Sequence, residues 1–435
     1  MPSASLKNKI LKTFQNGQID ILKISRSNKP SSSRELSALI IPPAQVPGGL
    51  GDDAMLSSII GHLLSHDFKR IGIVTFDTRH KWGMQEFVTE VVGTVARADK
   101  FQLVKALSNY THLYCVGADV LDGFYSDIDA CDRLRLVELA AKLGIKTTIV
   151  GFSFNEKPTP RAVEAFSKLP SNVQLCCRDS ISRQRLSRYI QYPIRLVSDV
   201  AFLLQPINES DLVSRMADWI ANQKADGRTV VGFNAKHLYP GEGKQISNGD
   251  LINIYASALA TVFQQDPTIS FLLIPHDTRG ALSDVALAEA IFNALPAEMQ
   301  PYCTQVPLPC RAAEIKGIGA HLDMVVTGRM HLAIACLGQV TPVAGITYQG
   351  KFEGLFEHFN LNPQKVLITP ENALQAGKLA AFMMNVIPQR EAIKEQIQAE
   401  LGKVQALARQ NFTDLETKEN FPVESIQSLA SGVIS

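Results

Sequence analysis

The sequence predicts an α/β protein with two doubly wound, Rossmann-like domains that face a cleft. Short apolar, β-branched segments alternate with helical patterns along most of the 435 residues. This alternation is typical of parallel sheets with helices on both faces. The length favours two to three domains, and the polar, proline-containing segment 205–211 is the expected hinge. Ligands of such sheets bind at the carboxyl ends of the strands, so we expect both domains to present binding residues there.

The predicted N-terminal domain covers residues 37–205 and begins with a strand. Its expected strands are 38–41, 71–76, 112–116, 147–152, 173–177 and 194–197, each a short apolar run. The expected helices between them are 52–66, 84–95, 131–142, 160–168 and 180–189.

The predicted C-terminal domain covers residues 212–385 and repeats the same rhythm. Its expected strands are 229–233, 270–275, 324–327, 342–346 and 366–368. The expected helices are 248–264, 280–293, 312–320, 329–337 and 351–359. A charged helical tail, residues 386–435, is expected to follow, with a long surface helix over 388–409 that could fold back across the first domain.

Composition excludes several classes of protein. A net charge of +1 argues against a protein built mainly to hold nucleic acid, because neutralising phosphates needs a basic surplus. No apolar run approaches the roughly 20 residues of a membrane-spanning helix. The seven cysteines lack zinc-ligand spacing, so we expect reduced thiols, no metal and a cytoplasmic location.

Residues 1–36 form a basic segment that we interpret as an amphipathic leader. Leu6, Ile10, Leu11 and Phe14 would share one face of a short helix. Packing of this helix on the domain is the simplest interpretation. Peripheral contact with the inner face of a membrane, or a transit peptide, are the alternatives.

The strongest functional pattern lies in the predicted C-terminal domain. An apolar strand runs into Gly328, and Arg329 and His331 then open a helix of small residues. The next strand ends near Tyr348, and Lys351 opens the helix after it. Helix N-termini favour anions, so these cations suit a ligand with phosphate and carboxylate groups, and the histidine is placed to move a proton.

Weaker patterns lie at other predicted strand ends. The loop with Gly49, Gly51 and Asp52 presents amides at a helix start, although Asp52 could simply be a helix cap. Arg178 ends a strand and could bind an anion bidentately, or pair with Asp179 at the surface.

A further strand end carries His276 and Asp277. We expect these side chains at the cleft. A histidine at the end of a strand is nevertheless more often structural than catalytic.

Together these motifs resemble the polysaccharide pyruvyl transferase family. Gly328-Arg329-Met330-His331 and Tyr348-Gln-Gly-Lys351 are similar to its closing pattern. Ordered upstream matches are Gly48-Gly-Leu-Gly51-Asp52, Gly151-Phe-Ser, Arg178-Asp179, Asp199-Val-Ala-Phe, Gly232-Phe-Asn234 and Ile274-Pro-His-Asp277. The first loop departs from the family in Gly49 and Asp53, where Asn and Glu are more usual, which bears on the acceptor more than on the donor.

The resemblance implies a two-domain fold of the GT-B type, with phosphoenolpyruvate as donor and no cofactor. The acceptor would be a sugar diol of a cell-surface or exopolysaccharide glycan, or of its free or lipid-linked precursor, and the product would be a pyruvate ketal. We expect His331 to transfer the proton, with Arg329, Lys351 and Arg178 binding the donor. The loop 48–53 and the pair His276 and Asp277 are the weaker candidates for binding the acceptor. A nucleotide-sugar glycosyltransferase and a non-catalytic glycan-binding protein are the alternatives, and the sequence indicates no oligomeric state.

Overall fold

The computed structural model describes residues 35–44, 47–75, 84, 87–93, 105–238, 246–279, 283–347, 350–413 and 415. The predicted leader helix and Tyr348 lie outside these residues. The chain divides into two compact units. Unit 1 contains Met1–Val46, Ile59–Val197 and Gln410–Ser435, and unit 2 contains Pro47–Ser58 and Ser198–Arg409.

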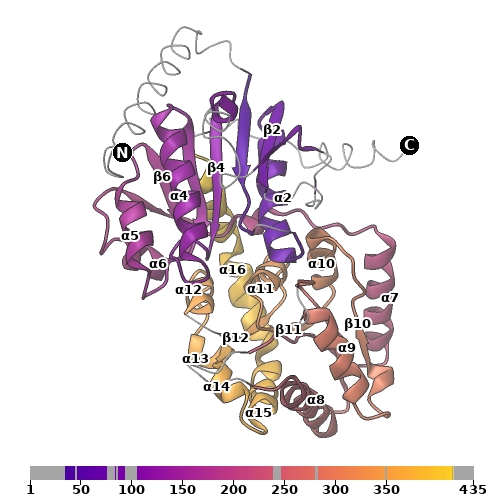
Figure 1. Cartoon of the computed structure of the whole chain (residues 1–435). Coiled ribbons are helices and arrows are strands. Elements are labelled where there is room, and N and C mark those ends of the chain that lie inside the picture. Colours follow the sequence, from indigo (N-terminus) through magenta and orange to yellow (C-terminus); the bar gives the residue numbers. More distant parts are fainter. Residues whose placement is uncertain are drawn as a thin grey trace. The chain divides into compact units, whose positions relative to one another are not determined.

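Unit 1 is built on a seven-stranded parallel sheet of order β3-β2-β1-β4-β5-β6-β7 (Figure 1). The strands are β1 Ser37–Ile41, β2 Arg70–Thr75, β3 Glu90–Gly93, β4 His112–Ala118, β5 Lys146–Phe152, β6 Val173–Cys177 and β7 Ile194–Leu196. The helices are α4 Asp127–Lys142, α5 Pro160–Ser167, α6 Ser180–Leu186 and the 3-10 helix η6 Gln410–Phe412, while α2 Leu50–Ser65 runs across the division of the units. Strands β1 and β4 are buried throughout, as expected for a sheet covered on both faces.

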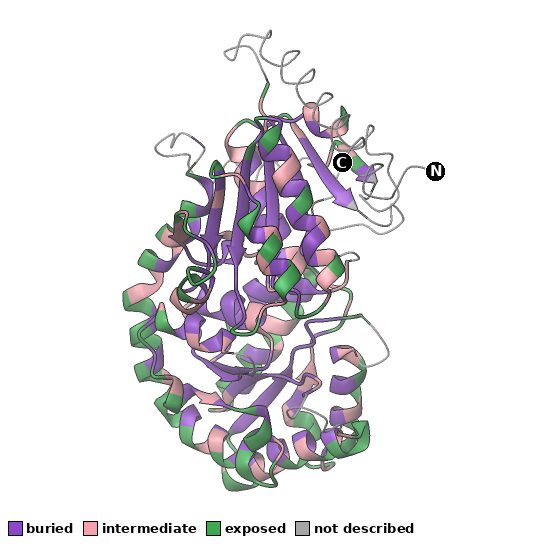
Figure 2. Ribbon diagram, turned by 60° about the vertical axis from the view of Figure 1, so that its left-hand side comes forward, coloured by how far each residue is buried: buried purple, intermediate pink, exposed green. Residues whose placement is uncertain are grey.

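Unit 2 contains a six-stranded parallel sheet of order β10-β9-β8-β11-β12-β13. The strands are β8 Thr229–Asn234, β9 Ile269–Leu273, β10 Cys303–Gln305, β11 Met324–Thr327, β12 Val343–Ile346 and β13 Leu367–Ile368. The helices are α7 Asp211–Ala225, α8 Asn248–Gln265, α9 Asp284–Ala294, α10 Ala312–Gly319, α11 Met330–Leu337, α12 Lys351–Glu357, α13 Pro363–Val366, α14 Pro370–Ala373, α15 Lys378–Val386 and α16 Arg390–Arg409. Short 3-10 helices are η3 Val200–Leu203, η4 Gln300–Tyr302 and η5 Ile387–Gln389. Figure 2 shows the strands as buried and the helices as partly exposed.

Both sheets confirm the prediction of two parallel-sheet α/β domains, and most predicted strands and helices occur within a few residues of their expected ends. The predicted helix 84–95 is wrong, because Glu90–Gly93 forms edge strand β3 and pairs with β2. Its adjacent Val91 and Val92 favour a strand. Val366 was expected in a strand but ends α13, and the short edge strand β10 was not predicted.

The division of the chain differs from the predicted domains in three places. Residues 47–58 and 198–204 belong to unit 2, although they were predicted in the N-terminal domain. The expected hinge 205–211 lies within unit 2, and the predicted tail helix, found as α16, belongs to unit 2 as well. The helix buries Ile397 and Val404, and Ser198 Oγ donates to the Val404 carbonyl at 2.6 Å. Buried apolar residues on one face therefore tie α16 to this unit.

Within the described part of the chain, no helix has both the length and the apolar character needed to cross a membrane.

Candidate active site

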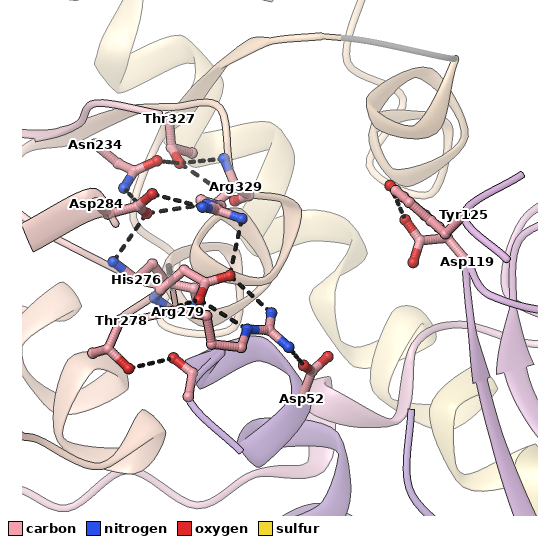
Figure 3. Close-up of polar contacts among 12 residues, drawn as sticks. Asp52, Asp119, Tyr125, Asn234, His276, Thr278, Arg279, Asp284, Thr327 and Arg329 are labelled. Atoms are coloured by element: carbon pink, nitrogen blue, oxygen red, sulfur yellow. Dashed lines mark hydrogen bonds and ion pairs between the residues drawn. The ribbon is translucent and has the colours of Figure 1, made fainter. Parts of the chain in front are cut away.

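The strand order of unit 2 predicts where a ligand would bind. The chain moves from β8 to one side of the sheet and later returns to β11 on the other, which makes these neighbouring strands a topological switch point. Asn234 ends β8 and Thr327 ends β11, and Thr327 Oγ1 donates to Asn234 Oδ1 at 3.2 Å (Figure 3). The residues described below gather around this pair.

Arg329 is held by a buried carboxylate. Its Nε and Nη2 donate to Oδ2 and Oδ1 of Asp284 at 3.0 and 2.6 Å. Asp284 also accepts from Asn234 Nδ2 at 3.0 Å and from the His276 amide at 3.1 Å. This bidentate pair fixes the plane of the guanidinium. The Arg329 side chain stays 26% exposed, so it is not fully enclosed by these partners.

Asp277 joins two arginines. It accepts from Arg329 Nη1 at 3.3 Å and from Nε and Nη2 of Arg279 at 2.9 and 2.8 Å. Burial acts to raise the pKa of Asp277, but the hydrogen bonds from Arg279 and the charge of Arg329 outweigh it and lower the pKa below its ordinary value. Asp277 is therefore ionised at neutral pH.

Arg279 continues this network to the first turn of α2. Its Nη1 donates to Asp52 Oδ2 at 2.8 Å, and its hydrogen bonds with Asp277 raise its pKa. Asp52 lies inside the first turn of α2, which begins at Leu50, so it is not the helix cap. Gly49 forms an antiparallel bridge with Asp277, which fixes the start of α2 against the end of β9.

His331 lies against the first turn of α2. A Cβ atom on Gly51 would come within 2.4 Å of His331 Nδ1, a separation that no real side chain tolerates. The imidazole and the helix backbone can thus approach closely only because residue 51 is glycine.

The other ring nitrogen of His331 faces a second buried carboxylate. Its Nε2 lies 3.6 Å from Asp199 Oδ2, and this Nε2 is buried without a hydrogen bond to the described residues. The His331 side chain is 16% exposed, and that exposed area lies elsewhere on the side chain. Solvent and ligands therefore reach the ring from a side other than Nε2.

His276 is buried beside this group, and neither ring nitrogen makes a hydrogen bond within the described residues. Burial, aided by the nearby charges of His331 and Arg329, lowers the pKa of His276 to about 3. His276 is consequently neutral near pH 7 and is unsuited to donate a proton there.

The two remaining predicted residues, Lys351 and Arg178, are both buried. Lys351 is buried at the start of α12, directly after Gly350, which adopts a left-handed conformation with φ 72°. Arg178 belongs to unit 1, where it is buried and its Nε donates to Ser153 Oγ at 2.8 Å. Asp179 is also buried and caps α6 through Ser182, which rules out the alternative of a surface pair with Arg178.

Unit 2 therefore brings together most of the predicted site: Gly49, Gly51, Asp52, His276, Asp277, Arg329 and His331. Sequence reasoning did not find Asp284, Arg279 or the role of Asp199. Asp199 stood within one of the matched motifs but was given no role in the site. The position of Asp284, early in the helix after β9, is the sequence feature that could have indicated it.

The fold is similar to that of several solved structures. A putative UDP-N-acetylglucosamine 2-epimerase from Listeria monocytogenes has a TM-score of 0.56 at 10% identity, covering 90% of this chain and 100% of its own. A glycosyltransferase from Rickettsia africae has a TM-score of 0.51 at 13% identity, with coverages of 88% and 100%. The UDP-GlcNAc 2-epimerase from Neisseria meningitidis, bound to UDP-GlcNAc, gives 0.52 at 10%, with coverages of 91% and 100%. These similarities place the chain in the class of GT-B-like proteins with two parallel-sheet α/β domains.

The family follows from the sequence. The model of the polysaccharide pyruvyl transferase family matches residues 10–350, and the chain belongs to this family. A search of curated proteins gave no match.

Proposed function

We propose that this protein transfers the pyruvyl group of phosphoenolpyruvate to two hydroxyls of a sugar and releases phosphate. The acceptor is a diol on a cell-surface or exopolysaccharide glycan or on its precursor. Membership of the polysaccharide pyruvyl transferase family supports this class of reaction. The contact of His331, two residues after the fixed Arg329, with the first turn of α2 is the observation that carries the proposal.

The donor meets cationic and dipolar groups in unit 2. The partly exposed side chain of Arg329 is assigned to the phosphate, and the N-terminal end of the 16-residue helix α2 favours an anion nearby. Lys351 and Arg178 are assigned to the donor on the family pattern. Because Asp277 already accepts from two arginines, we propose that it orients them, while the loop at Gly49 and Asp52 is assigned to the acceptor.

The reaction begins with a proton from His331 to the methylene carbon of phosphoenolpyruvate, which leaves an oxocarbenium ion at the neighbouring carbon. One sugar hydroxyl attacks this carbon and loses its proton. The carbon–oxygen bond to phosphate then breaks, with both electrons leaving on the phosphate. A second hydroxyl of the same sugar attacks, loses its proton and closes the ketal. His331 is suited to give the first proton and accept a later one.

The test measures phosphate released from phosphoenolpyruvate with galactose-, mannose- and glucose-containing acceptors. We expect acceptor-dependent release by the wild type and a loss of about 10²–10⁴-fold in His331→Ala. The exposed His321→Ala, also in unit 2, is the matched control and should keep full activity.

Absence of release with every acceptor, together with absence of phosphoenolpyruvate binding, would overturn the proposal. The same acceptors with UDP-sugars then test the nucleotide-sugar glycosyltransferase. Glycan binding without any transfer would instead support the non-catalytic alternative.

A further inference from the structure

The 3-10 helix η3 (Val200–Leu203) is held at both ends by buried polar contacts. At its start, Asp199 Oδ1 accepts from the Ala201 amide at 2.9 Å. At its end, Lys316 Nζ donates to the carbonyls of Phe202 and Leu204 at 3.2 and 2.6 Å. Burying the ammonium group of Lys316 is itself unfavourable. The stability of so short a helix as η3 therefore does not by itself account for this buried lysine. These contacts fix the position of Asp199.

The two carboxylate oxygens of Asp199 have different surroundings. Oδ1 caps η3, whereas Oδ2 lies 3.6 Å from His331 Nε2. The Asp199 side chain is 2% exposed, so its charge is poorly screened by water. His276 lies within electrostatic range of both His331 and Arg329 but is neutral near pH 7, and the positive end of α2 lies at Gly51. Arg329, two positions earlier in the chain, and the positive end of α2 oppose a positive imidazole, whereas Asp199 favours it.

We propose that Asp199 is a positioning residue that fixes the orientation of the His331 ring, with Nε2–H directed at the carboxylate. This leaves Nδ1–H, on the edge where Gly51 has no side chain, as the proton that the reaction uses. After that proton leaves, the neutral ring keeps Nε2–H and presents the Nδ1 lone pair as a base. The kinetic consequence of this inference rests on the proposed function. The interaction between the Asp199 and His331 side chains does not.

Asp199→Asn is the informative variant, because it keeps an oxygen for the η3 cap and removes the charge. We expect kcat to fall about 10²-fold and the alkaline limb of its pH profile to move to lower pH by about one unit. The exposed Asp218→Asn is the control and should match wild type. Unchanged kcat and pH profile in Asp199→Asn would overturn the proposal.

A second measurement tests the interaction of Asp199 with His331 without requiring pyruvyl transfer. NMR titration of the histidine rings, with His331→Ala to identify the resonance, follows the imidazole directly. We expect the titration midpoint of His331 to be lower in Asp199→Asn than in wild type, even if no pyruvyl transfer is found. Equal midpoints in two folded proteins would contradict the coupling.

An independent feature of unit 1 is an exposed aromatic turn, residues 119–125, at the carboxyl end of β4. Strands β1 and β4 form the topological switch point of this sheet. Phe124 and Tyr125 are each 54% exposed, with ring centroids 5.1 Å apart. Tyr125 Oη donates to Asp119 Oδ2 at 3.1 Å, as Figure 3 shows. Two adjacent exposed aromatic rings are unusual on a surface unless they bind something.

The turn is well anchored beneath these rings. Asp122 is buried and accepts from the amides of Phe124 and Asn155 at 3.0 and 3.1 Å. The Asp122 carbonyl accepts from the Thr159 amide at 2.9 Å. Fixed aromatic rings lose little entropy on binding. Aromatic faces beside a carboxylate and a phenol match a sugar, which has an apolar C–H face and hydroxyl edges.

We infer that the aromatic turn binds a sugar ring of the glycan acceptor, which names an acceptor subsite for the proposed function. In Phe124→Ala/Tyr125→Ala we expect the acceptor KM to rise about tenfold, with the KM for phosphoenolpyruvate unchanged. Saturation-transfer NMR with the same oligosaccharides tests binding without the reaction. Tyr189→Ala, a separate exposed aromatic, is the control.

Unchanged oligosaccharide binding and unchanged acceptor KM in the double variant would overturn this inference. Loss of binding to anionic vesicles, with oligosaccharide binding intact, would overturn it as well and assign the turn to a membrane surface.

Discussion

Gly51 and His331 are 280 positions apart in the chain, yet a Cβ atom at residue 51 would lie 2.4 Å from the histidine Nδ1. The first turn of α2 thus forms one wall around the imidazole. Gly51 and His331 both belong to unit 2, so the contact between them lies within one compact unit.

Gly51→Ala is expected to push the His331 ring out of place, because the added methyl overlaps Nδ1. Displacement of a catalytic group by about 1 Å can cost about 10² in rate, and we expect that loss in kcat. Steady-state kinetics measure the effect. Gly61→Ala is the control, because Gly61 lies in the same helix with open space around it, and its kcat should equal that of wild type.

Asp284→Asn tests the support beneath Arg329. The amide keeps the size of the side chain but loses the charge and one acceptor for the guanidinium. We expect the unfolding free energy to fall by about 1–3 kcal/mol, because a buried charge-assisted hydrogen bond is lost. Chemical denaturation measures the stability, and a raised KM for phosphoenolpyruvate should accompany it. A wild-type KM and stability would contradict the orienting role of Asp284.

Arg329→Lys is expected to behave as a severe change although it conserves charge. A lysine cannot reproduce the two-point contact with Asp284 or the third contact with Asp277. We expect kcat/KM for phosphoenolpyruvate to fall at least tenfold, since a fixed donor group is replaced by a flexible one. Recovery of wild-type kcat/KM in this variant would show that charge alone is sufficient.

Lys316 makes stability depend on pH in an identifiable way. Burial lowers the pKa of Lys316 to about 8, whereas an unfolded lysine titrates near 10.5. Between these values the unfolded chain binds a proton that the native protein has released, so the unfolding free energy rises with pH. Lys316→Met lacks this contribution. The stability of wild type relative to the variant should therefore rise by about 3 kcal/mol from pH 7 to pH 10.5, measured by denaturation across that range.

The fold was largely predictable from the sequence because parallel strands such as β1 and β4 are continuous apolar runs. Edge strands gave a weaker pattern. In edge strand β3, the Glu90 side chain is 36% exposed and pairs with Arg70 of β2, so the local composition there favoured a helix.

The site was predictable where its residues follow the ends of predicted strands, as Asp277, Arg329 and His331 do. Asp284 and Arg279 were not found, since Asp284 lies 45 residues from its partner Arg329, and Arg279 lies 227 residues from its partner Asp52. Contacts over such separations depend on strand order, which the sequence pattern alone did not specify.

The assignment of residues 47–58 to unit 2 restricts how this protein can be divided. A fragment that starts at Ser198 would keep Arg329, Asp284 and His331 but lose the backbone that bridges to Asp277. Exchange of whole N-terminal halves between homologous chains would likewise replace the segment against which the imidazole rests. A chimaera should therefore take residues 47–58 from the same parent as the rest of unit 2, so that His331 keeps its native surroundings.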